Sequence, residues 1–143
     1  LRTLQIKEAA AKEFAEAGQL FSGMRQYADG YRCYVKSLGL KSDSVVREKF
    51  ATLCQELGFV RNAVQNFEIL GRSYHDDKQF DAAAFYFEKA FHLDPRNFTL
   101  ARYYAFSVFN STFPTDRFER AKKAAAILSR LIDQAPDFQK AEL

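Results

Sequence analysis

The sequence lacks the features that mark most enzymes, membrane proteins and nucleic-acid-binding proteins. It has no Trp, two His and two Cys, and it contains no nucleophile elbow, phosphate-binding loop or metal-ligand spacing. No apolar run approaches the roughly 18 residues that a transmembrane helix needs. The net charge of +3 is too small to indicate a nucleic-acid-binding surface, which requires clustered Lys and Arg. We therefore expect no enzyme, no cofactor and no metal site.

The two cysteines carry little chemical information. Cys33 and Cys54 lie in helical patterns, and their spacing fits neither a metal site nor a redox motif. We expect both to be free thiols, buried or half-buried. Free thiols favour a reducing compartment, so we expect the protein in the cytoplasm. Because the chain begins at Leu1 rather than Met, we expect a piece of a longer protein, in which an upstream signal or anchor would not be visible.

The sequence does contain many apolar and aromatic side chains at helical spacing. With 143 residues, 48% of them hydrophobic, and 15 Phe, the chain is large enough for one domain with a continuous core. We expect a single domain over residues 1–143, all-α and without strands. The periodicity predicts about seven helices, near residues 4–23, 27–40, 45–57, 60–74, 80–93, 97–110 and 116–134, and a further segment that begins at Pro136.

Residues 64–97 have the most regular pattern. Apolar residues three and four apart form one stripe before the polar stretch 75–79 and another after it: Phe67, Leu70, Gly71 and Tyr74, then Phe80, Ala83, Phe87 and Ala90. We expect an antiparallel helix hairpin in which Gly71 and Ala83 lie at the closest approach and the aromatic side chains fill the space around it. Pro95 ends the second helix, and Asn97 is a good N-cap for the next.

This segment has the 34-residue length of a tetratricopeptide repeat and resembles one in sequence. The resemblance is carried by Leu70-Gly71, by Tyr74, by the alternation of aromatic residues and Ala, and by the closing run Leu93-Asp94-Pro95. It implies antiparallel hairpins stacked as a short right-handed solenoid, which binds other proteins on the concave face lined by the first helix of each repeat. A looser match covers residues 11–44, and a partial one covers residues 98–136.

The two better matches disagree about the helix near residues 60–74. The match at 11–44 makes it the second helix of a repeat, whereas the match at 64–97 makes it a first helix. We give precedence to the central match and expect an irregularity near residues 45–60, with the helix at 45–57 as an inserted or capping element. Gly30 stands where the repeat usually has Ala. Since Gly costs about 1 kcal/mol relative to Ala in a helix, we expect Gly30 to mark a close helix contact.

The helix near residues 116–134 should begin at a capping pair, Asp116 with Glu119, and bury one apolar stripe. The members of this stripe are Phe118, Ala121, Ala124, Leu128, Leu131 and Ile132. His75, Asp76 and Asp77 are consecutive turn residues that point in different directions. We interpret them as a solvated turn rather than as a metal or acid–base site.

The groove side of the central hairpin and of the following helix predicts where a partner binds. The helical offsets select Gln65, Glu68, Arg72, Arg102, Phe106 and Phe109 as partner-binding residues. Arginine and aromatic residues dominate binding hot spots. Phe106 and Phe109 can instead be core residues against the next helix, and the sequence leaves these two alternatives open.

We expect a protein–protein interaction module, or scaffold, that binds a peptide or helix of a partner protein. A second interpretation is a structural segment of a longer helical-repeat subunit in a large assembly. Nucleic-acid binding through the basic residues between 117 and 130 is a remote alternative, because acidic residues on the same helix dilute their field. The carboxylate-clamp members of the family hold Lys, Asn and Arg at groove positions that here carry Ala15, Gln19, Ile69, Thr99 and Tyr103. Binding of chaperone tails is therefore not expected.

Overall fold

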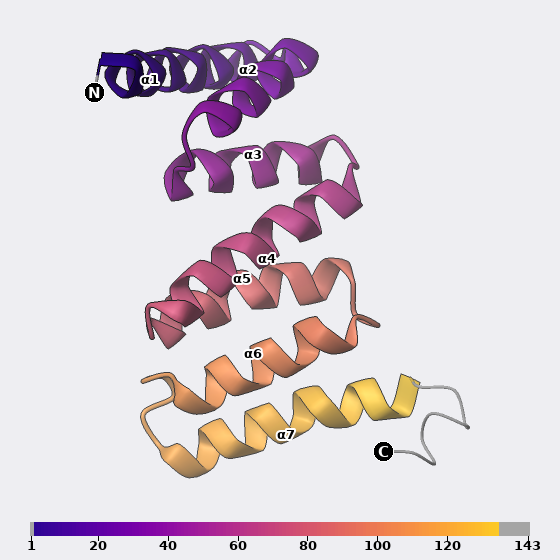
Figure 1. The fold of residues 1–143 in the computed structure, drawn as a ribbon. Helices are drawn as coiled ribbons and strands as arrows, with labels where there is room; N and C mark the ends of the chain where they lie inside the picture. Colours follow the sequence, from indigo (N-terminus) through magenta and orange to yellow (C-terminus); the bar gives the residue numbers. More distant parts are fainter. Residues whose placement is uncertain (1, 135–143) are drawn as a thin grey trace. The chain divides into compact units, whose positions relative to one another are not determined.

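The computed structural model describes residues 2–134, which form seven α-helices and no strand. The helices are α1 (Arg2–Gly23), α2 (Tyr27–Leu40), α3 (Ser44–Glu56), α4 (Val60–Asp76), α5 (Phe80–Leu93), α6 (Phe98–Asn110) and α7 (Arg117–Gln134), as Figure 1 shows. The predicted all-α class is confirmed, and the predicted bounds of α2 and α5 agree with the structure. The segment predicted to begin at Pro136 lies outside the described residues. None of the described helices is long and apolar enough to cross a membrane.

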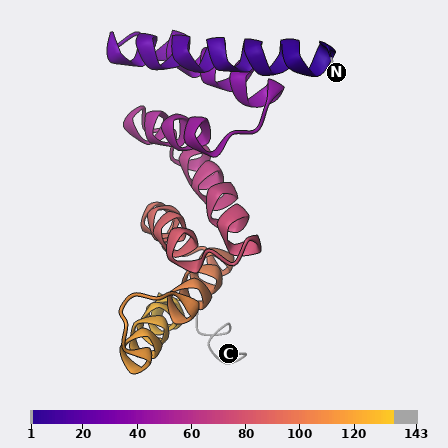
Figure 2. The same cartoon turned by 90° about the vertical axis from the view of Figure 1, so that its left-hand side faces the viewer.

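The helices form two compact units, and the boundary between Asn66 and Phe67 falls inside α4. In the N-terminal unit α2 packs along α1, and α3 packs on α2 with a smaller contact to α1 (Figures 1 and 2). In the C-terminal unit the second half of α4 packs on α5, α5 on α6, and α6 on α7. Successive helices run antiparallel, and this packing of neighbours is consistent with a helical repeat.

Three connections share one backbone geometry. They are the short turns after α1, α3 and α4, and the middle residue of each has a positive φ, 60° at Arg25, 79° at Gly58 and 60° at Lys78. The N–H of the next residue donates to a carbonyl five residues earlier, at 2.8 to 2.9 Å in all three turns. This is the Schellman ending of a helix, which satisfies carbonyl groups that the helix end would leave open.

The connections before α3 and α6 end instead on a side-chain cap. Asp43 accepts a hydrogen bond from the N–H of Val46 at 3.1 Å, and Asn97 accepts one from the N–H of Leu100 at 3.1 Å. The predicted N-cap at Asn97 is confirmed. Among the described helices, α4 alone has a Schellman turn both before and after it, so the alternation of the two kinds of turn changes there.

The hairpins α1–α2 and α4–α5 also share a packing contact. A Cβ atom at Gly18 would lie 3.0 Å from the ring of Tyr34, and a Cβ atom at Gly71 would lie 2.7 Å from the ring of Phe87. Both rings are buried, with 3% and 0% of their surface exposed. Glycine in the first helix therefore makes room for an aromatic ring of the second. The sequence places Gly71 and Ala83 at the closest approach of the two helices; in the structure the Phe87 ring lies nearest to a Cβ atom at Gly71, and Ala83 is fully buried.

Gly30 makes the close helix contact that the sequence predicts. A Cβ atom there would lie 2.6 Å from Oγ of Ser22 and 3.2 Å from the backbone oxygen of Gly18. Ser37, on the same side of α2, is buried, and its hydroxyl donates to the carbonyl of Ala11 at 2.7 Å. Gly30 and Ser37 thus bring α2 close to the backbone of α1.

Helix α7 buries only part of the predicted stripe. Leu131 is buried as predicted, and Ala121 and Ala124 are half-buried, whereas Phe118, Leu128 and Ile132 are 67%, 37% and 41% exposed. Ile127, which the predicted stripe leaves out, is buried as well. Within the described chain α7 packs against α6, and this contact selects the side that carries Ile127 and Leu131. The prediction is therefore wrong for Phe118, Leu128 and Ile132, because helical periodicity alone does not decide which of two apolar sides meets the neighbouring helix.

The start of α7 confirms one half of the predicted capping pair. Asp116 accepts a hydrogen bond from the N–H of Phe118 at 2.9 Å. The carboxylate of Glu119 lies 3.7 Å from Nζ of Lys122, a residue further along its own helix. Asp116 therefore caps the helix, and Glu119 pairs within it.

Candidate functional site

The C-terminal unit builds an aromatic surface outward from its core. The buried ring of Phe87, seated against Gly71, stacks on the half-buried ring of Tyr103 with centroids 5.1 Å apart and an angle of 16°. The guanidinium of Arg72 lies 5.0 Å from the centroid of the Tyr103 ring, a distance at which a cation is attracted to the ring face. Arg72 also pairs with Glu68 one turn earlier, at 3.0 Å. Core packing and an ion pair thus both hold Arg72 in place.

Three more rings extend this surface. The ring of His75 lies 5.6 Å from that of Phe80, 5.4 Å from Tyr103 and 5.3 Å from Phe106, and the rings of Phe80 and Phe106 are 5.8 Å apart. Such edge-to-face and tilted arrangements are favourable for aromatic pairs. The side chains come from α4, from the first residue of α5 and from α6. We call Arg72, His75, Phe80, Tyr103 and Phe106 the aromatic surface.

Phe106 and Phe109 are both surface residues. Phe106 is 51% exposed and Phe109 is 37% exposed, so neither is a core residue against α7. The two residues have different neighbours. Phe106 packs in the aromatic surface, whereas the ring of Phe109 lies 5.7 Å from the guanidinium of Arg117 at the start of α7.

The structure brings together only part of the predicted set. Glu68 and Arg72 form an ion pair beside the aromatic surface, and Arg102 is exposed on α6 one turn before Phe106. Arg102 makes no ion pair with the described residues. Gln65 is exposed but belongs to the N-terminal unit. Whether these residues bind a partner stays a prediction.

Two rings that organise the surface were left out of the predicted partner-binding set. His75 lies on the groove side of α4 by helical offset but was interpreted as part of a solvated turn. That interpretation is wrong for His75, because α4 continues to Asp76 and the His75 ring is half-buried among three others. Tyr103 was named only as a groove position of the resembled family. It precedes Phe106 by three residues, a spacing that puts both on one helix face and could have identified it.

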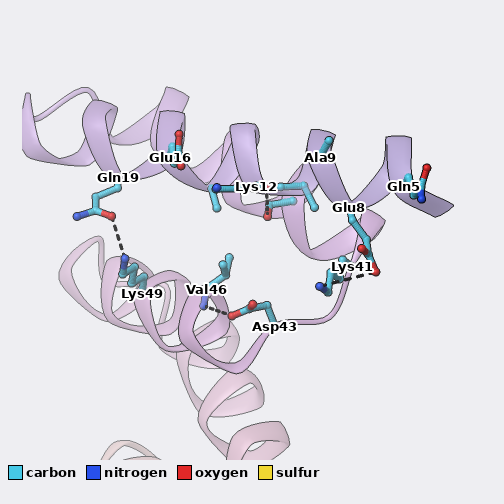
Figure 3. Close-up of a pocket in the computed structure, with 13 residues that line it drawn as sticks. Gln5, Glu8, Ala9, Lys12, Glu16, Gln19, Lys41, Asp43, Val46 and Lys49 are labelled. Atoms are coloured by element: carbon cyan, nitrogen blue, oxygen red, sulfur yellow. Dashed lines mark hydrogen bonds and ion pairs between the residues drawn. The ribbon is translucent and has the colours of Figure 1, made fainter. Parts of the chain in front are cut away.

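The N-terminal unit has a groove between α1 and α3, lined by charged and amide side chains and by small apolar ones. Figure 3 shows this hollow, with a volume of about 550 Å³, and the side chains around it. One face of α1 forms a wall, the end of α2 and the first turns of α3 form the other, and the floor consists of small side chains. The lining residues are Gln5, Glu8, Ala9, Ala11, Lys12, Ala15, Glu16, Gln19, Ser37, Lys41, Asp43, Val46 and Lys49.

Two polar contacts span this groove. Nζ of Lys41 lies 3.9 Å from the carboxylate of Glu8, and Nζ of Lys49 donates to the side-chain oxygen of Gln19 at 2.8 Å (Figure 3). Lys12 lies between them on α1. The groove therefore presents charged and amide groups over a small apolar floor, in contrast to the rings of the C-terminal unit.

The described residues include few groups suited to catalysis or metal binding. No group of three or more His, Cys, Asp and Glu among them is placed to hold a metal ion. Cys33 and Cys54 are free, half-buried and buried respectively, as predicted. Burial raises the pKa of Cys54 to about 11, and burial together with the nearby Glu88 raises that of Tyr104 to about 12. Both groups stay protonated at neutral pH.

No known protein-family model matches the chain, and no curated protein sequence matches it.

Proposed function

We propose that the chain is a protein-interaction module of tetratricopeptide-repeat type, whose aromatic surface binds a segment of another protein. The observation that carries the proposal is the guanidinium of Arg72 held over Tyr103 beside the half-exposed ring of Phe106. Arginine and aromatic side chains dominate binding hot spots. Because the core already orders these side chains, a partner would lose little affinity to their immobilisation.

The chemistry of the surface favours a segment with an apolar side chain near an acidic one. Phe106 offers exposed apolar area, and burying such area is the main favourable contribution in protein association. Arg102, one turn earlier on α6, makes no ion pair with the described residues. A carboxylate at Arg102 would set the direction and register of the bound segment.

A peptide selection tests this proposal. Random peptides displayed on phage are selected against the whole chain, and the affinity of an enriched peptide is measured for Phe106→Ala. We expect at least tenfold weaker binding, which is about 1.4 kcal/mol, and a free energy of unfolding close to that of the unaltered protein. Phe85→Ala is the matched control, because Phe85 on α5 is also 51% exposed. Equal losses in both variants, or none in Phe106→Ala, would place the binding surface elsewhere.

A second candidate function is a structural segment of a larger helical-repeat assembly. Phe118, Leu128 and Ile132 leave an apolar side of α7 exposed, and a covering helix or subunit would bury it. In that case Leu128→Asp with Ile132→Asp would abolish assembly into the complex, and peptide selection would enrich no ligand for the aromatic surface.

A further inference from the structure

The connection between α6 and α7 is tied to α5 by one carboxylate. Asp81, in the first turn of α5, accepts a hydrogen bond from the backbone N–H of Thr112 at 2.9 Å and another from its hydroxyl at 2.5 Å. The hydroxyl of the neighbouring Ser111 lies within hydrogen-bond distance of the carbonyls of Val108 and Phe113. These hydrogen bonds attach the first half of the connection to α5 and to α6.

A single arginine anchors the second half. The guanidinium of Arg120, on α7, donates to the carbonyl oxygens of Phe109 at 3.2 Å, Pro114 at 2.8 Å and Thr115 at 2.9 Å. Hydrogen bonds from a charged donor are among the stronger ones in proteins. We call residues 111–116 the α6–α7 loop. Hydrogen bonds thus hold the backbone of this loop in place. No aromatic ring takes part in them.

Phe113 stands at the tip of this ordered loop. Its side chain is 78% exposed, more than that of any other large apolar residue in the described chain. An exposed ring is unfavourable in water, and burying it against a partner would be favourable. Since the hydrogen bonds of Asp81 and Arg120 already hold the loop, a partner that receives the ring would not have to order the backbone.

A polar hollow adjoins the loop. It has a volume of about 350 Å³ and is lined by Lys78, Gln79, Phe80, Asp81, Ala82, Asn110, Ser111 and Thr112. The hydrogen bonds from Thr112 hold the pKa of Asp81 below its ordinary value, so the carboxylate is charged at neutral pH. A carboxylate can accept about four hydrogen bonds; Thr112 supplies two of them, and the backbone N–H of Phe113 supplies a third. One acceptor position of Asp81 therefore remains for a donor, and because the carboxylate is charged, a basic side chain suits it best.

We propose that the α6–α7 loop is a second docking site, for a folded protein that receives the Phe113 ring in an apolar pocket and places a basic side chain beside Asp81. An anionic lipid surface fits the Asp81 carboxylate less well, because its phosphate and carboxylate groups would repel it. Residues 116–123 nevertheless carry four basic and two acidic side chains, so binding to anionic lipid is a named outcome of the test below. The site uses neither Arg72 nor Phe106, and it shares only Phe80, in the lining of the hollow, with the aromatic surface.

Photo-crosslinking from the loop tip tests this docking site. Phe113 is replaced by p-benzoylphenylalanine in the full-length protein in its own cells, and the residues to which it attaches are mapped by mass spectrometry. We expect attachment inside an apolar pocket of one folded protein, with Lys or Arg nearby. The yield should fall at least tenfold when Asp81→Ala releases the loop. Thr112→Val, which removes only the hydroxyl bond, gives a smaller loss and serves if Asp81→Ala does not fold.

Two controls separate this result from other outcomes. The same amino acid at Phe85, exposed on α5, should not attach to that protein. Vesicles of phosphatidylcholine and phosphatidylserine should not sediment the purified chain in a manner that depends on Phe113. Attachment to lipid, no attachment, equal attachment from position 85, or attachment unaffected by both loop variants would each overturn the proposal.

Discussion

The hairpins α1–α2 and α4–α5 have the same construction but carry different surfaces. Both turn through a residue with a φ of 60°, Arg25 in one and Lys78 in the other. Both seat a buried ring against a glycine, Tyr34 on Gly18 and Phe87 on Gly71. The backbone of a hairpin is therefore determined by a few positions, and the neighbouring positions are free to differ.

The difference is clearest one residue after each glycine. Gln19 accepts a hydrogen bond from Lys49, which is the sixth residue after the N-cap of α3. Arg72 lies over Tyr103, which is the sixth residue after the N-cap of α6. Equivalent positions thus make a polar contact across a groove in one unit and a cation–ring contact in the other. We infer that these positions are where the two units acquire separate binding properties.

The largest effect on stability is expected from removing a buried ring that packs against a hairpin glycine. Phe87→Ala should lower the free energy of unfolding by about 3 to 5 kcal/mol, since the ring is fully buried and its loss leaves a cavity. It should also abolish binding at the aromatic surface, because Tyr103 loses the ring on which it stacks. Tyr34→Ala should destabilise on a similar scale and leave that binding intact. Urea unfolding and peptide affinity measure the two effects, and a loss below 1 kcal/mol for Phe87→Ala would contradict the shared construction.

A smaller effect is expected from the glycines, and it should separate the two hairpins. Gly71→Ala places a methyl group 2.7 Å from a ring that has no room to move, so we expect a loss of about 1 to 3 kcal/mol. Gly18→Ala meets its ring at 3.0 Å, and the gain in helix propensity of about 1 kcal/mol should offset most of the strain. Thermal unfolding of both variants checks the order. Equal shifts would mean that the two contacts are equally tight.

The smallest effect on stability is expected at the surface positions. Arg72→Gln removes a half-exposed ion pair and a cation–ring contact, so the free energy of unfolding should change by about 1 kcal/mol or less. Binding at the aromatic surface should weaken at least tenfold. Lys49→Gln, the matched change in the N-terminal unit, should leave that binding unaltered. If both variants reduce binding alike, the difference between the two units has no functional meaning.

Local signals in the sequence were sufficient for most of the helix bounds. The apolar spacing from Phe80 to Ala90, the cap at Asn97 and the end of α2 at Leu40 all depend on residues within a turn or two of one another. The close approach at Gly30 was also predictable, because a glycine that weakens a helix is retained where backbones must meet. Arg72 and Phe106 were selected as groove residues by helical offset, although the sequence left a core role open for Phe106.

What the sequence did not decide was which side of a helix meets which neighbour. Periodicity placed Phe118, Leu128 and Leu131 in one buried stripe of α7, yet of these three only Leu131 is buried, together with Ile127, on the side that packs against α6. His75 likewise reads as a turn residue until the rings of α5 and α6 are beside it. Both outcomes depend on the rotation of one helix against another, which no local pattern specifies.

The sequence by itself determined seven helices, the turns between them and the glycines at which hairpins close. The tertiary structure alone decided that Arg72, Tyr103 and Phe106 form one surface, because these residues come from helices that are not consecutive. The physical reason is the ring of Phe87. It lies between Gly71 on one side and Tyr103 on the other, and so sets the distance and rotation of α6 relative to α4.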